Sequence, residues 1–343
     1  MAVVDLATAT VIDVISAGVV DFSRGLPEIE TFEVGGLPEI GQTPEGEAIL
    51  LGGFSGLWFE GLNPDNGNLQ FLTVSDRGPV GPNDLLATDG VTLGRQFLLP
   101  DFQARVITLE LNPATGVVTV LDQLLLTREE GGQSIPITGL PNIPGFSETP
   151  LDAALNPIPP DPFGSDTEGI FRAPNGNLWT VDEEAPSIFV YSPEGVLIER
   201  FVPQGYAALA GAAPGTFGSE TLPSVYLERR GGRGFEAIAF DDENNIVYAF
   251  IQTPLSNPSL ATSNASSVLR ILGIDPASGT PVAEFVYLLN TPALVTAEEG
   301  IGFGDAEVDR IGDAVFAGDG QFFVVERDNE DSNTAQQFIF RSI

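Results

Sequence analysis

A hairpin pattern that recurs four times along the 343-residue chain constrains its fold more than any other feature. Each copy has a short run of β-branched and aromatic residues, a turn rich in Pro, Asp, Asn and Gly, and a second such run. This is the pattern of two antiparallel strands joined by a tight reversal. The copies are GGFSGLWFEGLNPDNGNLQFLTVSDRG (52–78), DTEGIFRAPNGNLWTVDEEAP (166–186), GFEAIAFDDENNIVYAFIQTP (234–254) and IGDAVFAGDGQFFVVERDN (311–329).

A second type of hairpin follows most of these copies, at 106–126, 188–202 and 269–289, with the closely similar turns NPATG and DPASG. Each pair of hairpins makes a four-stranded antiparallel unit. Such units, repeated along a chain with almost no helical periodicity, are typical of a β-propeller. We therefore predict an all-β fold, a β-propeller of four-stranded antiparallel blades, with four first hairpins readable and five or six blades compatible with the length. A β-sandwich is the competing fold, and the repeated units fit radial repetition better.

The stretches between the hairpins are rich in Gly, Pro and acidic residues, which predicts loops at 79–101, 128–164, 203–233 and 291–310. Segment 128–164 is long for a connection without structure of its own, and it is expected to be a lid or rim loop and not a domain linker. The whole chain, 1–343, is then a single domain. The last hairpin is followed only by the strand-like run QQFIFRSI. Either residues 10–22 supply a closing outer strand, or the chain is part of a longer polypeptide.

Three residue types are missing from the chain, and their absence excludes several kinds of active site. There is no Cys and no His, and all 14 basic residues are Arg. Disulfides, thiolate nucleophiles, Cys-ligated metals, Ser-His-Asp triads, HExxH zinc sites and lysine Schiff bases are therefore excluded. Quinone-dependent sugar oxidation is disfavoured, because it generally relies on a histidine base. Any site must use carboxylates, arginine, hydroxyls, amides, aromatics, backbone groups and a captured cation.

The formal net charge of −34 repels nucleic acid and anionic membranes, so neither is an expected partner. No apolar run reaches the roughly 20 residues that span a bilayer, and no membrane insertion is expected. The N-terminus shows no signal peptide, but the near absence of oxidisable residues suits an extracellular or periplasmic protein. No feature of the sequence indicates an oligomeric state.

Carboxylates recur at two corresponding places in the four first hairpins. In an antiparallel pair, the start of the first strand lies beside the end of the second, and in a propeller both surround the mouth of the central channel. Aligning the copies gives one column with Ser55, Glu168, Glu236 and Asp313, and a second with Asp76–Arg77, Glu183–Glu184, Ile251–Gln252 and Glu326–Arg327.

This convergence of like charges is costly unless a cation neutralises it, and calcium tolerates irregular sets of oxygen ligands. The alternative is that these carboxylates cap backbone N–H groups or pair with arginine between blades. Two other acidic or basic features are weaker. The loop ERDNEDSN (326–333) lacks EF-hand spacing, and the cluster Arg229, Arg230 and Arg233 fits either an anion site or pairing with the acidic surface.

At these residues the sequence resembles the phytase-like family, the "esterase-like activity of phytase" propeller domain. The resemblance rests on GGFSGLWF with TVSDRG, on DTEGIFRAPNGNLWTVDEEAPSIFVYSPEG, on RGFEAIAF with YAFIQTPL, and on IGDAVFAGDGQFFVVERD. It implies a relative of calcium-dependent propeller phytases that hydrolyses phosphoric esters. By this resemblance the family's motif residues correspond to Asp76, Arg77, Glu168, Glu183, Glu236, Asp313, Glu326 and Arg327. Family members usually continue into a further blade, so the chain is expected to be a C-terminally truncated form.

The resulting hypothesis is calcium-dependent hydrolysis of a small anionic substrate such as a phosphate ester. Calcium would be held by Asp76, Glu168, Glu236, Asp313 and Glu326, and would activate a water for attack on phosphorus. Arg77 and Arg327 would clamp the phosphate, and Glu183 would take the proton of the water. The alternatives are a non-catalytic ligand- or partner-binding propeller module of a secreted protein, and a calcium-dependent lactonase or other ester hydrolase.

Overall fold

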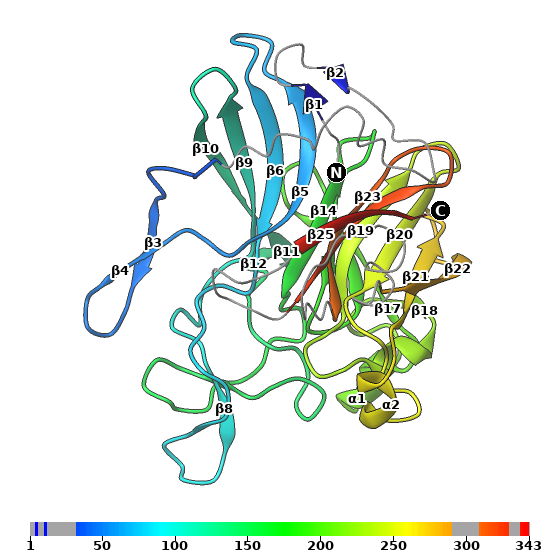
Figure 1. Ribbon diagram of the computed structural model, residues 1–343. Coiled ribbons are helices and arrows are strands. Elements are labelled where there is room, and N and C mark those ends of the chain that lie inside the picture. Colours follow the sequence, from blue (N-terminus) through cyan, green and yellow to red (C-terminus); the bar gives the residue numbers. More distant parts are fainter. Residues whose placement is uncertain (1–3, 6–9, 12–31, 290–308, 329–336, 343) are drawn as a thin grey trace.

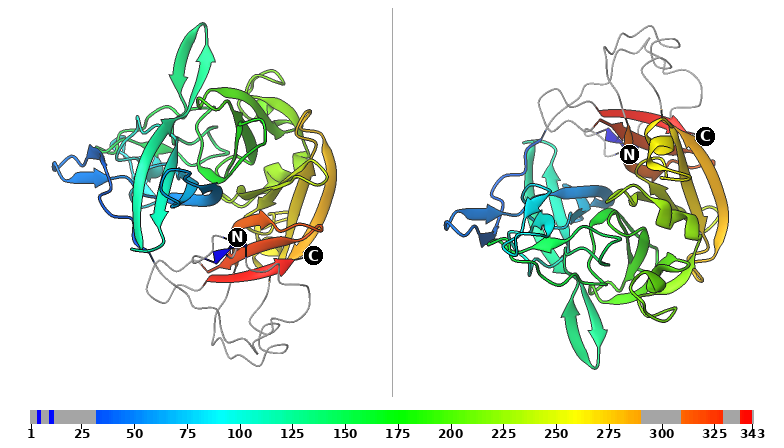
Figure 2. Two further views of the ribbon diagram at one scale, coloured as in Figure 1. Left: turned by 90° about the horizontal axis from the view of Figure 1, so that it is seen from above. Right: turned by 90° about the horizontal axis from the view of Figure 1, so that it is seen from below.

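The computed structural model describes residues 4–5, 10–11, 32–289, 309–328 and 337–342. In this part of the chain four antiparallel sheets surround a common axis as the blades of a β-propeller (Figures 1 and 2). The all-β propeller predicted from the hairpins is confirmed. The first blade consists of β5 (Phe54–Leu62), β6 (Leu69–Ser75), β9 (Arg105–Asn112) and β10 (Val117–Leu125), and the second of β14 (Thr167–Arg172), β15 (Leu178–Asp182), β16 (Ser187–Tyr191) and β17 (Leu197–Pro203). The third consists of β19 (Phe235–Asp241), β20 (Ile246–Ile251), β21 (Val268–Ile274) and β22 (Pro281–Leu288). The fourth consists of β23 (Arg310–Phe316), β24 (Phe322–Arg327) and β25 (Gln337–Ser342).

The innermost strands of neighbouring blades pack against one another around the ring: β5 on β14, β14 on β19, β19 on β23, and β23 on β5. Glycine permits the closest approach. A Cβ atom on Gly169 of β14 would lie 2.6 Å from the backbone N of Ile238 in β19. Aromatic rings fill the space between blades. The ring centroid of Phe171 in the second blade lies 6.2 Å from that of Trp58 in the first and 5.3 Å from that of Phe240 in the third. These contacts fix the inner strand ends on which the site is built.

The predicted loops contain more structure than the sequence suggested. Segment 79–101 forms β7 (Leu85–Leu86) and β8 (Leu93–Gln96), and β8 pairs in parallel with β13 (Pro150–Leu151) of segment 128–164. A hairpin of β11 (Thr127–Glu130) and β12 (Gln133–Pro136) projects outward from the ring (Figure 2). Segment 203–233 holds the helix α1 (Tyr206–Leu209), the strand β18 (Ser219–Leu222), which adds in parallel to β17, and the 3-10 helix η2 (Ser224–Glu228). These segments, predicted as loops, are organised by backbone pairings too short to show periodicity in the sequence.

The end of the chain agrees with the prediction of a single strand after the last hairpin, since β25 pairs with β24 as the third strand of its sheet. Of the candidate closing segment 10–22, the structure describes only Thr10–Val11 (β2), which pairs with Val4–Asp5 (β1) and not with β25. Its other residues lie outside the described part, as does most of the predicted loop 291–310. The remaining elements are β3 (Glu39–Gln42), β4 (Ala48–Leu50) and α2 (Leu260–Asn264).

Candidate functional site

A cavity of about 1210 Å³ opens where the inner strands begin, and the excursions around 80–95, 146–149 and 231–233 complete its wall. Glu148 and its neighbours line this cavity, which agrees with the prediction that segment 128–164 contains a rim loop. Nine carboxylates and five arginines line it. Because the chain has only 14 basic residues, more than a third of its cations are gathered here. The carboxylates are Asp76, Asp84, Glu148, Glu168, Glu183, Glu184, Glu236, Asp313 and Asp328, and the arginines are Arg77, Arg95, Arg233, Arg310 and Arg327.

A β-bulge at the start of every inner strand aims side chains into this cavity. The pairing register shifts after Ser55, after Thr167, after Phe235 and after Ile311. A bulge leaves one residue without a partner and turns its side chain away from the regular alternation. Glu168 and Glu236 occupy such positions. Gly312 is the matching residue of the fourth blade, and the predicted Asp313 follows it, still on the cavity wall.

The register corrects the second predicted column by one residue in two blades. Ser75, Asp182, Ile251 and Glu326 lie at the matching position, and all four are fully buried. The residue that comes directly after this position is Asp76 in the first blade, Glu183 in the second, Gln252 in the third and Arg327 in the fourth. The predicted column instead aligns Asp76 and Glu183 with Ile251 and Glu326.

Glu326, predicted as a metal ligand, is consequently not brought to the cavity. Successive residues of a strand face opposite sides, so Val325 and Arg327 line the cavity while Glu326 points behind it. There it accepts a hydrogen bond from the hydroxyl of Tyr287.

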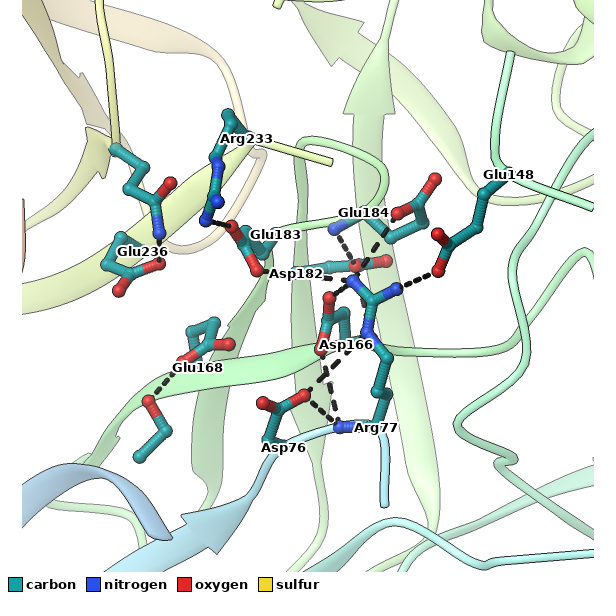
Figure 3. A network of polar contacts seen from close by, with 12 residues as sticks. Asp76, Arg77, Glu148, Asp166, Glu168, Asp182, Glu183, Glu184, Arg233 and Glu236 are labelled. Atoms are coloured by element: carbon teal, nitrogen blue, oxygen red, sulfur yellow. Dashed lines mark hydrogen bonds and ion pairs between the residues drawn. The ribbon is translucent and has the colours of Figure 1, made fainter. Parts of the chain in front are cut away.

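The structure brings the other predicted carboxylates together in two groups that share Glu168 (Figure 3). One group is Asp76, Asp166 and Glu168, and the other is Glu168, Glu183 and Glu236. Within each group the carboxylate oxygens lie within 4.8 Å of one another. Asp313 lines the same cavity but belongs to neither group, and its carboxylate accepts hydrogen bonds from the backbone N–H of Leu57 (3.2 Å) and Ala314 (2.8 Å).

Burial raises the pKa values of four of these carboxyl groups, those of Glu168, Glu183, Glu236 and Asp313. Desolvation, reinforced by the charge of Glu183, raises the pKa of Glu236 to about 8 against the opposing effect of Arg327. Desolvation and the charges of Glu236, Asp76 and Glu183 raise the pKa of Glu168 well above its usual value. The pKa of Glu183 is raised mainly by burial, although Arg233 and Arg77 oppose it, and burial raises that of Asp313 to about 6. The protein without a cation thus holds protons here that a metal ion would displace.

The guanidinium of Arg77 is enclosed by carboxylates (Figure 3). It is 8% exposed, and burial alone would lower its pKa, but the surrounding charges, Glu184 and Asp76 foremost, raise it above the usual value. Its contacts are ion pairs with Glu148 and Asp166, and approaches of 3.4 Å to Glu184, 3.8 Å to Asp76 and 4.0 Å to Glu183. Arg77 thus contacts five carboxylates, and its predicted role as a phosphate clamp stays a prediction.

Two other arginines face the cavity with fewer partners. Arg233 Nη1 lies 2.8 Å from Glu183 Oε1, and Arg327 Nη2 lies 3.1 Å from Glu236 Oε1. Each side chain is 32% exposed. Gln252 donates to the other oxygen of Glu236 at 2.6 Å. The two guanidiniums thus bracket the Glu183–Glu236 pair and leave N–H groups available to a ligand.

A buried brace behind the cavity fixes the turn that carries Glu183 and Glu184. Asp182 Oδ1 accepts hydrogen bonds from the backbone N–H of Asp166 (3.2 Å), Glu184 (2.9 Å) and Ala185 (3.2 Å). Its Oδ2 lies 3.7 Å from Nη2 of Arg200, which is 2% exposed. Burial raises the pKa of Asp182 to about 7, against the opposing effect of Arg200. One side chain thereby holds the start of β14 and the end of β15 in register.

The basic cluster of the sequence divides into separate roles. Arg229 is buried over the ring of Phe146 at 4.0 Å and donates to the carbonyl oxygen of Glu184 at 2.6 Å. Arg230 donates to Ser263, which leaves Arg233 as the cavity-facing member. Of the acidic loop 326–333, residues 329–333 lie outside the described part of the chain.

Several site residues were missed in the sequence. Asp166 lies two residues before Glu168 in DTEG, and strand alternation could have placed both on one face. Glu148 and Arg95 carry no such signal. Their 3.1 Å ion pair depends on the parallel pairing of β8 with β13, which joins segments far apart in the chain.

Comparison with known proteins places this site in a recognised sequence family. Residues 49–341 match the family model described as "Phytase-like: Esterase-like activity of phytase". An uncharacterized secreted protein of Arthroderma benhamiae is 24% identical over 247 residues, which are 64% of this chain and 47% of that protein. The chain thus spans about half the length of this curated relative.

Matches to solved structures are of low similarity. Myxococcus xanthus glutaminyl cyclase is 14% identical, with a TM-score of 0.33, and the match covers 84% of this chain and 89% of that one. The GH43 BlXynB protein from Bacillus licheniformis is 12% identical, with a TM-score of 0.34 and coverage of 84% and 40%. At this level these structures carry no argument about function. Of the described helices, none has the length and apolar character needed to cross a bilayer.

Proposed function

The chain belongs to the phytase-like family, and from this premise we propose that it is a calcium-dependent hydrolase of phosphoric esters. One observation carries the proposal. Two groups of carboxylates share Glu168, which lines the cavity, and two arginines whose side chains are 32% exposed bracket one of the groups. The combination offers oxygen ligands to a cation and guanidiniums to an anion at the same place.

The residues present fit calcium. All candidate ligands are carboxylate oxygens, which suit a hard cation, and their burial together leaves negative charge that Arg77 balances only in part. We assign the ligand role to Asp76, Glu168 and Glu236, as predicted, and add Asp166 and Glu183. A bound calcium ion would polarise the phosphoryl oxygens and lower the pKa of a water ligand.

The remaining residues orient the substrate and move a proton. Arg233 and Arg327 would each donate N–H groups to the phosphoryl oxygens and fix phosphorus above the carboxylates. Glu183, predicted to accept the proton, lies within a ligand group and pairs with Arg233, so we transfer this role to Asp313. Asp313 lines the cavity outside both groups, and its pKa of about 6 suits a base near neutral pH.

We further propose that the protein works outside the cytoplasm, in an extracellular or periplasmic setting. Its relative in Arthroderma benhamiae is named a secreted protein, which supports this proposal. The absence of Cys and the net charge of −34 also support it. Calcium is abundant in such surroundings, and weak sites for it can therefore be filled.

The test is an assay of 4-nitrophenyl phosphate and bis(4-nitrophenyl) phosphate with calcium and with EDTA. We expect turnover only with calcium, and a loss of about 100-fold or more in Glu168→Ala and Glu236→Ala. Glu194→Gln, which removes an exposed carboxylate that does not line the cavity, is the matched control. Calcium binding without turnover of any ester would favour the non-catalytic binding module. Turnover of lactones or carboxylic esters alone would favour the calcium-dependent lactonase or other ester hydrolase.

A further inference from the structure

The arginine side chains that line the cavity are already paired with carboxylates. Each of the five lining arginines forms an ion pair with an acidic side chain: Arg77 with five partners, Arg95 with Glu148, Arg233 with Glu183, Arg310 with Asp309, and Arg327 with Glu236. Arg77 and Arg310 are buried, at 8% and 4% exposure. Only Arg233 and Arg327, with Arg95 at 24%, expose enough guanidinium to bind a ligand.

Arg233 and Arg327 lie beside the same group of carboxylates. Glu183 and Glu236 belong to the same carboxylate group, whose oxygens lie within 4.8 Å of one another, and each holds one of these guanidiniums. A single tetrahedral phosphoryl group is the right size to receive N–H donors from both sides.

Away from this spot the wall is acidic and neutral. The rim presents the exposed Asp84, which has no arginine partner among the ion pairs of the described residues, and the carboxylate of Glu148. Glu148 pairs with the buried Arg77 through one oxygen and lies 3.1 Å from Arg95 through the other, so both guanidiniums are already neutralised there. The other lining side chains there include the exposed Asn83 and Leu93. Such a wall offers hydrogen bonds and apolar contact to an alcohol, and repels further anionic groups.

The net charge of the cavity lining also disfavours substrates with many phosphate groups. Nine carboxylates against five arginines leave an excess of four negative charges when all are ionised, which two divalent cations would cancel. An ester with six phosphates carries roughly nine or more negative charges, at about −1.5 each, and the cavity has no cationic surplus to match it.

We propose that the site is selective for esters with one phosphoryl group on a neutral or cationic alcohol, and that it discriminates against polyphosphorylated esters. This proposal rests on the proposed function and names its substrate class. Glu148 and Asp84 are the specificity-determining residues, because they place negative charge where additional phosphates would lie.

The test compares kcat/KM for 4-nitrophenyl phosphate and inositol hexakisphosphate at one free calcium concentration, below that at which the calcium salt precipitates. We expect a preference of at least about tenfold for the single phosphate. Glu148→Gln removes one carboxylate that neutralises both Arg95 and Arg77, so it should shrink the preference roughly tenfold. Asp84→Asn should act in the same direction, and Asn tolerates the left-handed backbone at this position (φ 55°). Glu194→Gln should leave the ratio unchanged.

Equal or better use of inositol hexakisphosphate would overturn the proposed selectivity while leaving phosphate ester hydrolysis intact. If neither ester is hydrolysed, the proposed function fails, and binding decides the selectivity. Calorimetric titrations with methyl phosphate and inositol hexakisphosphate then apply. Tighter binding of methyl phosphate supports the selectivity, and tighter binding of inositol hexakisphosphate, or binding of neither, refutes it.

Discussion

Glu168 occupies the position on which the site depends most at the scale of single residues. A bulge turns its side chain into the cavity, where it belongs to both carboxylate groups and accepts a hydrogen bond from Ser55. The residues around it have distinct tasks: Arg77 balances charge from within the wall, while Arg233 and Arg327 face the cavity. Separate tasks predict separate effects on binding and on catalysis.

Replacing the cavity-facing arginines tests their assignment to the substrate. Arg233→Gln and Arg327→Gln should each raise KM for 4-nitrophenyl phosphate about tenfold or more, because each removes a charge-assisted donor to the phosphoryl group. Calcium affinity should stay equal or increase, since a competing cation is lost beside Glu183 or Glu236. Steady-state kinetics and calcium titration measure the two effects. An unchanged KM in both variants would contradict the assignment.

Asp182 is predicted to support the site through stability. Asp182→Ala leaves the buried Arg200 without its carboxylate and three backbone N–H groups without their acceptor, which should cost about 3–5 kcal/mol of unfolding free energy. Asp182→Asn keeps an acceptor oxygen and should cost less. Urea denaturation followed by fluorescence gives both values. Equal losses in the two variants would show that the acceptor oxygen is not what matters.

At the scale of elements, the bulged inner strand is the unit that turns a repeated hairpin into a site. Four bulges at matching places bring side chains from β5, β14, β19 and β23 to one cavity. The strands must lie close together for this, and glycines at the contacts allow it. Close packing between inner strands should therefore be sensitive to a single methyl group.

Gly169→Ala tests this packing. Its Cβ would meet two backbone atoms of β19, the N of Ile238 at 2.6 Å and the Cα of Ala237 at 3.0 Å, and backbone cannot yield as a side chain does. We expect a loss of about 2 kcal/mol or more in unfolding free energy. Gly35→Ala, with no atom within 4 Å of its Cβ, should change stability by less than about 1 kcal/mol. Similar values for both variants would contradict close packing of the blades.

Elements also show how far sequence reasoning could go. Turns such as NPDNG and APNG mark tight reversals locally, so the hairpins and the propeller were predictable. The bulges were not, because a bulge changes the register without a distinct residue signal at these places, and the column of Glu326 was therefore misaligned by one residue. Glu148 and Arg95 meet only through long-range pairing of β8 with β13, which no local pattern encodes.

On the scale of the whole molecule, the net charge of −34 divides into a solvated coat and a cavity with a mixed lining. The pKa values of Glu236, Asp182 and Asp313 are raised to about 8, 7 and 6, so these groups bind more protons in the folded protein without calcium than in the unfolded chain between about pH 4 and 8. Their contribution to stability is present at low pH and is lost as the pH rises through this window. Calcium, which competes with these protons, should restore the stability.

The melting temperature in EDTA should therefore fall between pH 5 and pH 8, by at least about 3 °C. The increase produced by millimolar calcium should grow over the same range, because fewer protons compete for the ligands. Differential scanning calorimetry at matched ionic strength gives both trends. A melting temperature in EDTA that rises with pH, or a calcium effect that is the same at both pH values, would contradict this linkage.

Calorimetric titration of calcium into EDTA-treated protein at pH 7.5 tests the central claim, that the carboxylates around Glu168 form a cation site, most directly. The wild-type protein should bind calcium in roughly the micromolar to millimolar range, and Glu168→Gln should lose this binding while remaining folded. Glu194→Gln should bind as the wild type does. Absence of calcium binding by the wild-type protein, or undiminished binding by Glu168→Gln, would show that the carboxylate groups serve only to join the blades.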